Sequence, residues 1–284
     1  MKQFALFPLF EQEKYLFRNR IEGILKSMIT NQNNLTFSKE MRLYVGSESC
    51  ENLMPSRETL AKYIRLGQER SVSICLVTPF MITPTGSARL SVLLGLMNDR
   101  AAKKSEVIIN DWGALEMLQK YPRLVPVIGR ALNKMRRSVN PLAETKLLPY
   151  RSLFGISILS NPAICKFLKE KKVKAFGYDN LWHGIAPSKS ACHDLKTHLY
   201  FPLIPVSFTS NCLFASTNRE ENDKFRCGLS CKRECQEYYV ANSSYFDANN
   251  KSNLLMLSRG IYGCNNSLEG IPLKDFDRLV YVLH

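Results

Sequence analysis

The chain has 284 residues, 45% of them hydrophobic, and a formal net charge of +14. This length and apolar content allow one barrel-sized core or two smaller ones. No uninterrupted apolar run reaches the roughly eighteen residues that a membrane-crossing helix needs. The short apolar start of the chain ends at Glu11 and Glu13, and no small-residue cleavage site follows it. The sequence therefore predicts a soluble cytoplasmic protein without a membrane span or a secretory signal.

The excess of 39 Lys and Arg over 25 Asp and Glu favours anionic partners, such as RNA, an anionic small molecule or an acidic protein surface. A solvated basic exterior explains the same charge equally well. The densest basic runs, residues 130–137 and 166–174, lack the regularly interleaved aromatic residues of a single-strand stacking platform. The charge therefore permits nucleic-acid binding without identifying it.

Strand and helix patterns alternate through most of the chain. Residues 1–40 are expected to form an N-terminal extension, with an amphipathic helix over about 11–30. Beyond it, the expected strands are 41–47, 71–79, 106–111, 124–130 and 173–179, and the expected helices are 56–69, with Ser56 as its N-cap, 87–102, 112–121 and 161–172. This alternation is typical of parallel βαβ units. It predicts an α/β fold with a single TIM-barrel-like (β/α) domain, closed or incomplete, over residues 41–284.

The carboxyl ends of barrel strands usually carry the working residues. In this chain those positions hold Glu48, Cys50, Thr78, Pro79, Asn110, Asp111, Gly129, Arg130, Asp179 and Asn180. Asn110 and Asp111 are equally well explained as caps of the following helix. No glycine-rich phosphate-binding motif follows any expected strand, which disfavours nucleotide-binding versions of the fold.

Nine cysteines are present, and in a reducing compartment clustered cysteines indicate a metal or catalytic site rather than disulfides. Cys75 and Cys165 stand alone in apolar runs and are expected to be small buried hydrophobic residues. His193 and His198 are expected to be ordinary polar or capping residues. The motifs of zinc proteases, serine hydrolases and cysteine proteases are absent from the sequence.

Four cysteines lie within residues 211–235, in an expected loop over 208–236: Cys212, Cys227, Cys231 and Cys235. If residues 227–235 formed one helix, Cys227 and Cys235 would lie about 12 Å apart, too far to share one metal ion or cluster. Positions four apart suit two ligands of one site, so a pair from the last three is expected to bind. Zinc and an iron–sulfur cluster both accept four thiolates, but structural zinc sites usually bring two close pairs of cysteines and only one pair of that kind is available here.

Three segments resemble the collagenase-like (U-thirty-two) peptidase family: "EVIINDWGALEML" (106–118), "PVIGRALNKMRRSVNP" (126–141) and "HLYFPLIPVSFTSNC" (198–212). The C-terminal "GIPLKDFDRLVY" (270–281) is similar too. The size and layout look like those of the short iron–sulfur members, the UbiV-like proteins. Two positions depart from the pattern, because Ser210 and Asn211 replace the segment's usual arginine and "RRSVNP" lacks its acidic residue.

The resemblance implies a [4Fe–4S] cluster held by Cys50, Cys212, Cys227 and Cys231, with Cys235 as a bystander or a substitute ligand. It also implies a role in oxygen-independent hydroxylation of a ubiquinone-type or RNA substrate, beside a related partner subunit in a hetero-oligomer. Two alternatives stay open. One is a zinc-stabilised RNA-binding module, and the other is a peptidase, as the family name suggests.

Overall fold

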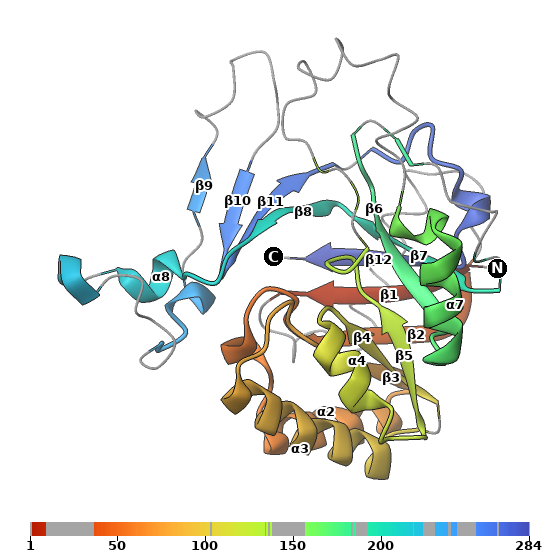
Figure 1. The fold of residues 1–284 in the computed structure, drawn as a ribbon, viewed down its shortest axis with the longest axis horizontal. Coiled ribbons are helices and arrows are strands. Elements are labelled where there is room, and N and C mark those ends of the chain that lie inside the picture. Colours follow the sequence, from red (N-terminus) through yellow and green to blue (C-terminus); the bar gives the residue numbers. More distant parts are fainter. Residues whose placement is uncertain are drawn as a thin grey trace.

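The computed structural model describes residues 2–9, 37–102, 104–133, 135, 137, 157–182, 184–185, 192, 194–217, 219–223, 231–237, 240–242, 254–265 and 267–283. A closed barrel of eight parallel strands forms the centre of the molecule, in the order β1-β12-β7-β6-β5-β4-β3-β2 (Figure 1). Its strands are β1 (Lys2–Pro8), β2 (Phe37–Gly46), β3 (Val72–Val77), β4 (Ser105–Ile109), β5 (Leu124–Ile128), β6 (Ala175–Asp179), β7 (Lys196–Phe201) and β12 (Arg278–Leu283). The predicted TIM-barrel-like α/β fold is therefore confirmed, with the barrel closed.

Helices cover the outside of the barrel (Figure 1). They are α2 (Arg57–Glu69), α3 (Pro84–Arg100), α4 (Trp112–Leu118) and α7 (Pro162–Glu170). The expected N-cap of α2 is confirmed, because the Ser56 hydroxyl accepts a hydrogen bond from the backbone N–H of Thr59 at 3.1 Å. Helix α2 then turns Leu60 and Ile64, one helical turn apart, into the core.

The strands contribute to two apolar cores because their side chains alternate between the two faces. Tyr44, Cys75 and Val280 belong to a core made by the inward faces of the strands. Leu43, Ile74 and Leu279, each one position away, pack in the larger core that includes the helices. Buried positions on both sides explain why these strands are continuous apolar runs in the sequence.

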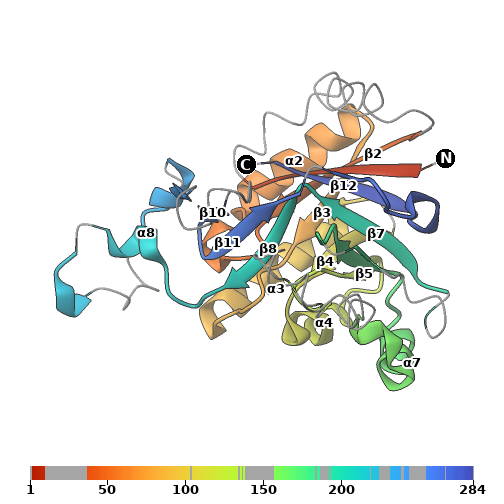
Figure 2. The same ribbon diagram turned by 90° about the horizontal axis from the view of Figure 1, so that it is seen from above.

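A second, antiparallel sheet is inserted between β7 and β12. It has the order β8-β11-β10-β9 and is built from β8 (Leu203–Phe208), β11 (Gly260–Cys264), β10 (Leu254–Leu257) and β9 (Val240–Asn242). Figures 1 and 2 show this sheet, with the short helix α8 (Leu213–Ser216), extending beyond the carboxyl ends of the barrel strands. The remaining described elements are the 3-10 turns η2 (Glu51–Leu53), η4 (Ile158–Ser160), η5 (Glu221–Asp223), η6 (Glu234–Gln236) and η7 (Leu273–Asp275).

One domain boundary differs from the expectation. The sequence placed residues 1–40 ahead of the barrel, whereas Lys2–Pro8 is a barrel strand that pairs with both β2 and β12. The pairing with β12 joins the two ends of the chain, which local sequence patterns do not report. The helix expected over 11–30 lies outside the described residues. Among the described residues, no helix has the length and apolar character required to span a membrane.

Candidate cysteine site at the carboxyl end of the barrel

The chain turns sharply where β2 ends and leads to Cys50. Gly46 has a φ of +119°, and a Cβ atom there would lie 2.4 Å from the carbonyl oxygen of Val77 on the neighbouring strand. Only glycine fits such a backbone and such a close approach. The Ser47 hydroxyl then accepts hydrogen bonds at 3.2 Å from the N–H groups of Ser49 and Cys50. Local geometry therefore fixes the backbone of Cys50, whose side chain is buried.

Two carboxylates on either side of Cys50 hold this loop to the barrel. The Glu51 carboxylate accepts hydrogen bonds from the backbone N–H of Thr83 at 2.9 Å and from its hydroxyl at 3.0 Å, just before α3. The Glu48 carboxylate accepts two hydrogen bonds from Arg130, one from Nε at 2.8 Å and one from Nη2 at 2.5 Å. Such a bidentate pair sets both the position and the orientation of the carboxylate.

Arg130 is the centre of a buried ionic network at the strand ends. Its Nη1 donates to Asp179 at 3.2 Å and to the carbonyl of Leu203, and its guanidinium lies 5.0 Å from the ring centroid of Tyr200. Burial alone would lower the pKa of Arg130, but the carboxylates of Glu48 and Asp179 hold it above its ordinary value. The guanidinium therefore stays charged and joins β2, β5 and β6 at one rim.

Arg137 extends the network beyond β5. Its Nε donates to the second oxygen of Asp179 at 2.6 Å, and its Nη2 donates to the carbonyl of Arg130 at 2.5 Å. Two guanidinium groups thus share the Asp179 carboxylate, whose side chain is fully buried. Sequence reasoning missed this role of Arg137, although the run "GRALNKMRR" placed it in a basic segment after a strand.

The cysteine cluster lies beyond this rim. Cys212 is the N-cap of α8, and its Sγ accepts a hydrogen bond from the N–H of Ala215 at 3.4 Å. Cys212 and Cys235 are both buried, in one apolar cluster with Phe214 and Ala215. Cys231 packs against that cluster together with Leu53 and Met256. Side chains from the loop after β2, from α8 and from strand β10 therefore enclose these thiols.

The thiols of this cluster are close enough to influence one another. Burial raises the pKa of Cys212, and the charges of Cys50 and Cys231 add to that rise. Burial, and after it the negative charges of Cys50 and Cys212, raise the pKa of Cys235 to about 12. Burial and adjacent negative charge both disfavour the thiolate forms of Cys212 and Cys235, and a bound cation would favour them.

The structure thus gathers Cys50, Cys212, Cys231 and Cys235, while Cys227 lies outside the described residues. Cys235 belongs to the buried group. In the described part of the chain, no three His, Cys, Asp or Glu side chains adopt the arrangement of a metal site. The structure describes only residues 231–235 of the segment 227–235 that was considered as one helix. These residues are not helical, because Arg233 has a φ of +65° and a 3-10 turn follows it.

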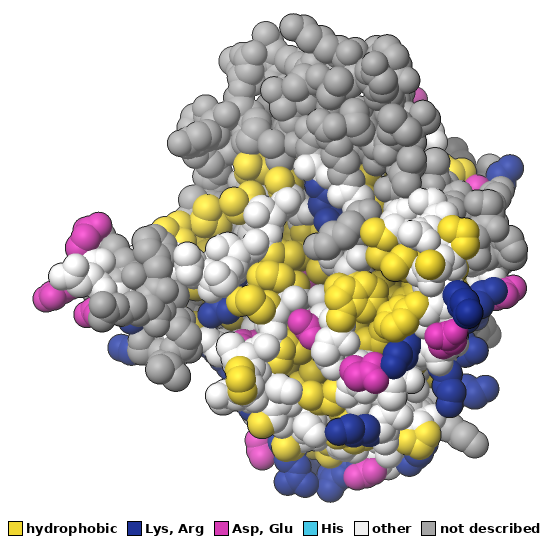
Figure 3. Space-filling model, in the orientation of Figure 1, with side chains coloured by type: hydrophobic (Ala, Val, Ile, Leu, Met, Phe, Trp, Pro, Cys, Tyr) yellow, Lys and Arg dark blue, Asp and Glu magenta, His cyan; other side chains and the backbone are white. Residues whose placement is uncertain are grey.

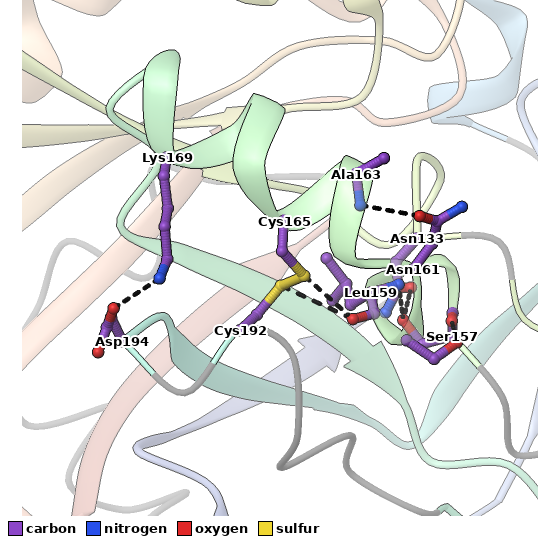
Figure 4. Close-up of a disulfide and its surroundings, with 10 residues drawn as sticks. Asn133, Ser157, Leu159, Asn161, Ala163, Cys165, Lys169, Cys192 and Asp194 are labelled. Atoms are coloured by element: carbon purple, nitrogen blue, oxygen red, sulfur yellow. Dashed lines mark hydrogen bonds and ion pairs between the residues drawn. A yellow bond between two sulfur atoms is a disulfide. The ribbon is translucent and has the colours of Figure 1, made fainter.

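The isolated cysteines divide into two cases. Cys75 is buried inside the barrel as expected, and burial raises the pKa of its thiol to about 12. Cys165 is also buried, but the expectation that it stands alone is wrong, since it forms a disulfide with Cys192 (Figure 4). Helix α7 and the segment before β7 bring their Cα atoms to 5.5 Å, a separation that suits a disulfide.

Other residues named from the strand ends have structural roles. Asp111 is the N-cap of α4 and accepts from the N–H of Ala114 at 3.0 Å, as the capping explanation predicts. Asn110 instead donates to the carbonyl of Thr78 at 2.8 Å and accepts from the N–H of Ala131 at 3.2 Å. His198 is a buried residue of strand β7 rather than a cap, and burial holds its pKa well below its ordinary value. His193 lies outside the described residues.

No family model and no curated protein matches the sequence. The chain is similar to the solved structure of a U32 (U-thirty-two) peptidase, Mk0906, with a TM-score of 0.46 and 12% identity over 100% of this chain and 93% of that chain. A protein from Aquifex aeolicus VF5 follows with a TM-score of 0.39 and 12% identity over 70% and 74% of the two chains. A further likeness is to proline utilization A from Bdellovibrio bacteriovorus inactivated by N-propargylglycine, with a TM-score of 0.35 and 14% identity over 69% and 25%. The first of these proteins carries the name of the family that the sequence motifs resemble.

Proposed function

We propose that this chain is a [4Fe–4S] cluster-binding protein of the U-thirty-two peptidase family that takes part in an oxygen-independent hydroxylation with a partner subunit. The observation that carries the proposal is the group formed by the buried Cys50, Cys212 and Cys235 and the partly buried Cys231. Cys50 follows the second barrel strand, whereas the other three lie after β8, so the fold brings distant thiols together. Thiolates in this number suit an iron–sulfur cluster or zinc.

The residues around the thiols prepare the site in two ways. Apolar side chains of Leu53, Phe214 and Met256 limit water beside the sulfur atoms, and backbone N–H groups donate to Cys212 and Cys231 at 3.4 Å each. Hydrogen bonds to sulfur and exclusion of water both tune the potential of a cluster. A cluster with four thiolate ligands supplies electron transfer or structural support, since none of its irons is open to substrate.

The family resemblance implies Cys227 as a ligand with Cys235 as a possible substitute, and the nearness of Cys235 to Cys50 and Cys212 supports the substitute. We propose Cys50, Cys212, Cys231 and Cys235 as the ligand set. Cys235→Ala is therefore expected to remove most of the bound iron, and Cys227→Ala is expected to retain it. The opposite pattern would assign the fourth ligand to Cys227.

Metal and sulfide analysis of anaerobically purified protein tests the function itself. We expect about four irons and four sulfides per chain and a broad visible absorption. Cys50→Ala should lose the cluster, whereas Cys75→Ala and Cys264→Ala, which change cysteines outside the group, should keep it. One zinc per chain without sulfide would favour the zinc-stabilised RNA-binding alternative. Protein without metal after anaerobic reconstitution would contradict both.

The substrate class belongs to the same proposal. A ubiquinone-type precursor or RNA follows from the family resemblance, and the partner subunit would complete the site. Co-expression with a related subunit, followed by size-exclusion chromatography of the anaerobic sample, tests the assembly.

A further inference from the structure

A second charged region lies at the opposite, amino-terminal end of the barrel. A cavity of about 550 Å³ opens there, with Leu124, Pro126 and Ala175 among its lining. These three side chains are buried and form an apolar floor. Five exposed cations share the lining: Lys104, Arg123, Lys172, Lys174 and Lys196. Its volume falls within the range of small-molecule sites.

The barrel topology brings these cations together. The backbone N–H of Lys104 bonds to the carbonyl of Arg123 at 3.0 Å, and that of Lys196 bonds to the carbonyl of Lys174 at 3.0 Å. The backbone N–H of Lys174 in turn donates to the carbonyl of Pro126 on β5 at 3.1 Å. The cations therefore stand at or just before the starts of β4, β5, β6 and β7, four neighbouring strands of one rim.

The positive charge of this cavity is not balanced from within. Its two carboxylates are already paired with cations outside the lining, Glu106 with Arg278 at 2.5 Å and Asp194 with Lys169 at 2.7 Å. Within the described residues, no carboxylate lies at ion-pair distance from any of the four lysines. Figure 3 shows Lys and Arg side chains along the margin of the molecule on the side where the barrel strands begin. Such a rim attracts anions.

Two of the five cations stand at left-handed backbone positions. Lys104 and Lys172 have φ values of +67° and +59°, in turns that lead toward β4 and β6. Glycine or asparagine is favoured at left-handed positions, because a longer side chain places its Cβ against the backbone. Two of the five cations therefore occupy positions where a neutral glycine would fit better.

We propose that this cavity, lined by Lys104, Arg123, Lys172, Lys174 and Lys196, binds a small organic anion that has a phosphate-type head and an apolar body. The lysines surround the head, and the floor of Leu124, Pro126 and Ala175 receives the apolar part. Among the described residues of the lining there is no aromatic side chain on which a nucleotide base could stack, which favours a small molecule over single-stranded RNA. The site is separate from the cysteine group at the other end of the barrel.

Isothermal titration calorimetry of the full chain with inorganic pyrophosphate tests the proposal. We expect saturable one-to-one binding that weakens as salt rises. The paired variant Lys104→Gly and Lys172→Gly should weaken it about tenfold. Its melting temperature should stay unchanged or rise, because glycine relieves the left-handed backbone. The control pair Lys120→Ala and Lys166→Ala removes the same charge from exposed positions outside the lining and should leave the affinity within about twofold.

Three results would overturn the proposal. Pyrophosphate fails to bind at millimolar concentration, or the control pair weakens binding as much as the glycine pair does. The third result comes from a parallel titration with a single-stranded RNA of about twelve nucleotides. If the glycine pair abolishes RNA binding and pyrophosphate binds no form of the chain, the cavity is part of an RNA-binding surface instead.

Discussion

Both ends of the barrel hold a buried ionic network, around Arg130 at the carboxyl end and between Arg278 and Glu106 at the amino end, but the amino end adds a rim of exposed cations. At the carboxyl end the side chain of Arg130 is 1% exposed, and the carboxylates of Glu48 and Asp179 that pair with it are 2% and 0% exposed. At the amino end the lysines around the cavity are exposed and unpaired within the described residues. Buried paired charges fix the geometry around Cys50, whereas exposed unpaired charges remain available to an external anion. Substitutions at each end test this difference.

The largest effect is expected from Arg130→Met. It leaves two buried carboxylates without their shared cation, which costs about 3–5 kcal/mol of the free energy of unfolding. Urea unfolding followed by circular dichroism measures the loss, and Arg130→Lys should recover part of it. Arg123→Met, an exposed arginine at the other end, serves as the control and should cost less than about 1 kcal/mol. Equal losses for the two methionine variants would remove the contrast between the two ends.

Glu106→Gln is expected to show the next largest effect, and one that depends on pH. Burial would raise the pKa of Glu106, but the hydrogen bonds and charge of Arg278 outweigh it and lower the pKa to about 2. A lowered folded-state pKa stabilises the ionised form, so about 3 kcal/mol is present above pH 4.5 and is lost as pH falls toward 2. The stability difference between wild type and Glu106→Gln should therefore shrink over that range.

Urea titrations between pH 2 and pH 7 check this window. Glu116→Gln is a matched control, because Glu116 forms an exposed pair with Lys171 at 2.5 Å. Exposed pairs contribute at most about 1 kcal/mol. A pH-independent difference between wild type and Glu106→Gln would contradict the role assigned to the ion pair with Arg278.

Glu51→Ala is expected to cost about 1–2 kcal/mol, because the backbone N–H and hydroxyl of Thr83 lose their shared acceptor. It should also lower the iron content of the anaerobic protein, since the loop that carries Cys50 loses one of its two anchors. Urea unfolding and iron analysis measure the two effects. Ser56→Ala, which removes only the cap of α2, should cost about 1 kcal/mol and leave the iron content unchanged.

The smallest effect is expected from Ser71→Gly at the amino end. Ser71 has a φ of +55° in the turn before β3, so glycine should stabilise the fold by up to about 1 kcal/mol. A rise in melting temperature by differential scanning calorimetry would confirm this. A fall would show that the serine side chain contributes more than its backbone conformation costs.

Much of the carboxyl rim followed from the sequence. Glu48, Arg130 and Asp179 each stand just after or at the end of a run that reads as a strand, and parallel strands end at a common rim. Their mutual pairing did not follow, because the alternation of strands and helices does not report which side chains face one another. The disulfide between Cys165 and Cys192 was missed for the same reason, since it joins a helix to the segment before the next strand.

The sequence by itself determined the periodic strands and helices, because burial of one helix face or of both strand faces leaves a local pattern. That pattern was enough for the parallel α/β barrel and for the residues at its rim. Tertiary structure alone decided that β1 meets β12, that Cys235 lies near Cys50 and Cys212, and that five cations surround one cavity. These contacts join distant residues, and closing such long loops is decided by packing across the whole molecule rather than by local propensity.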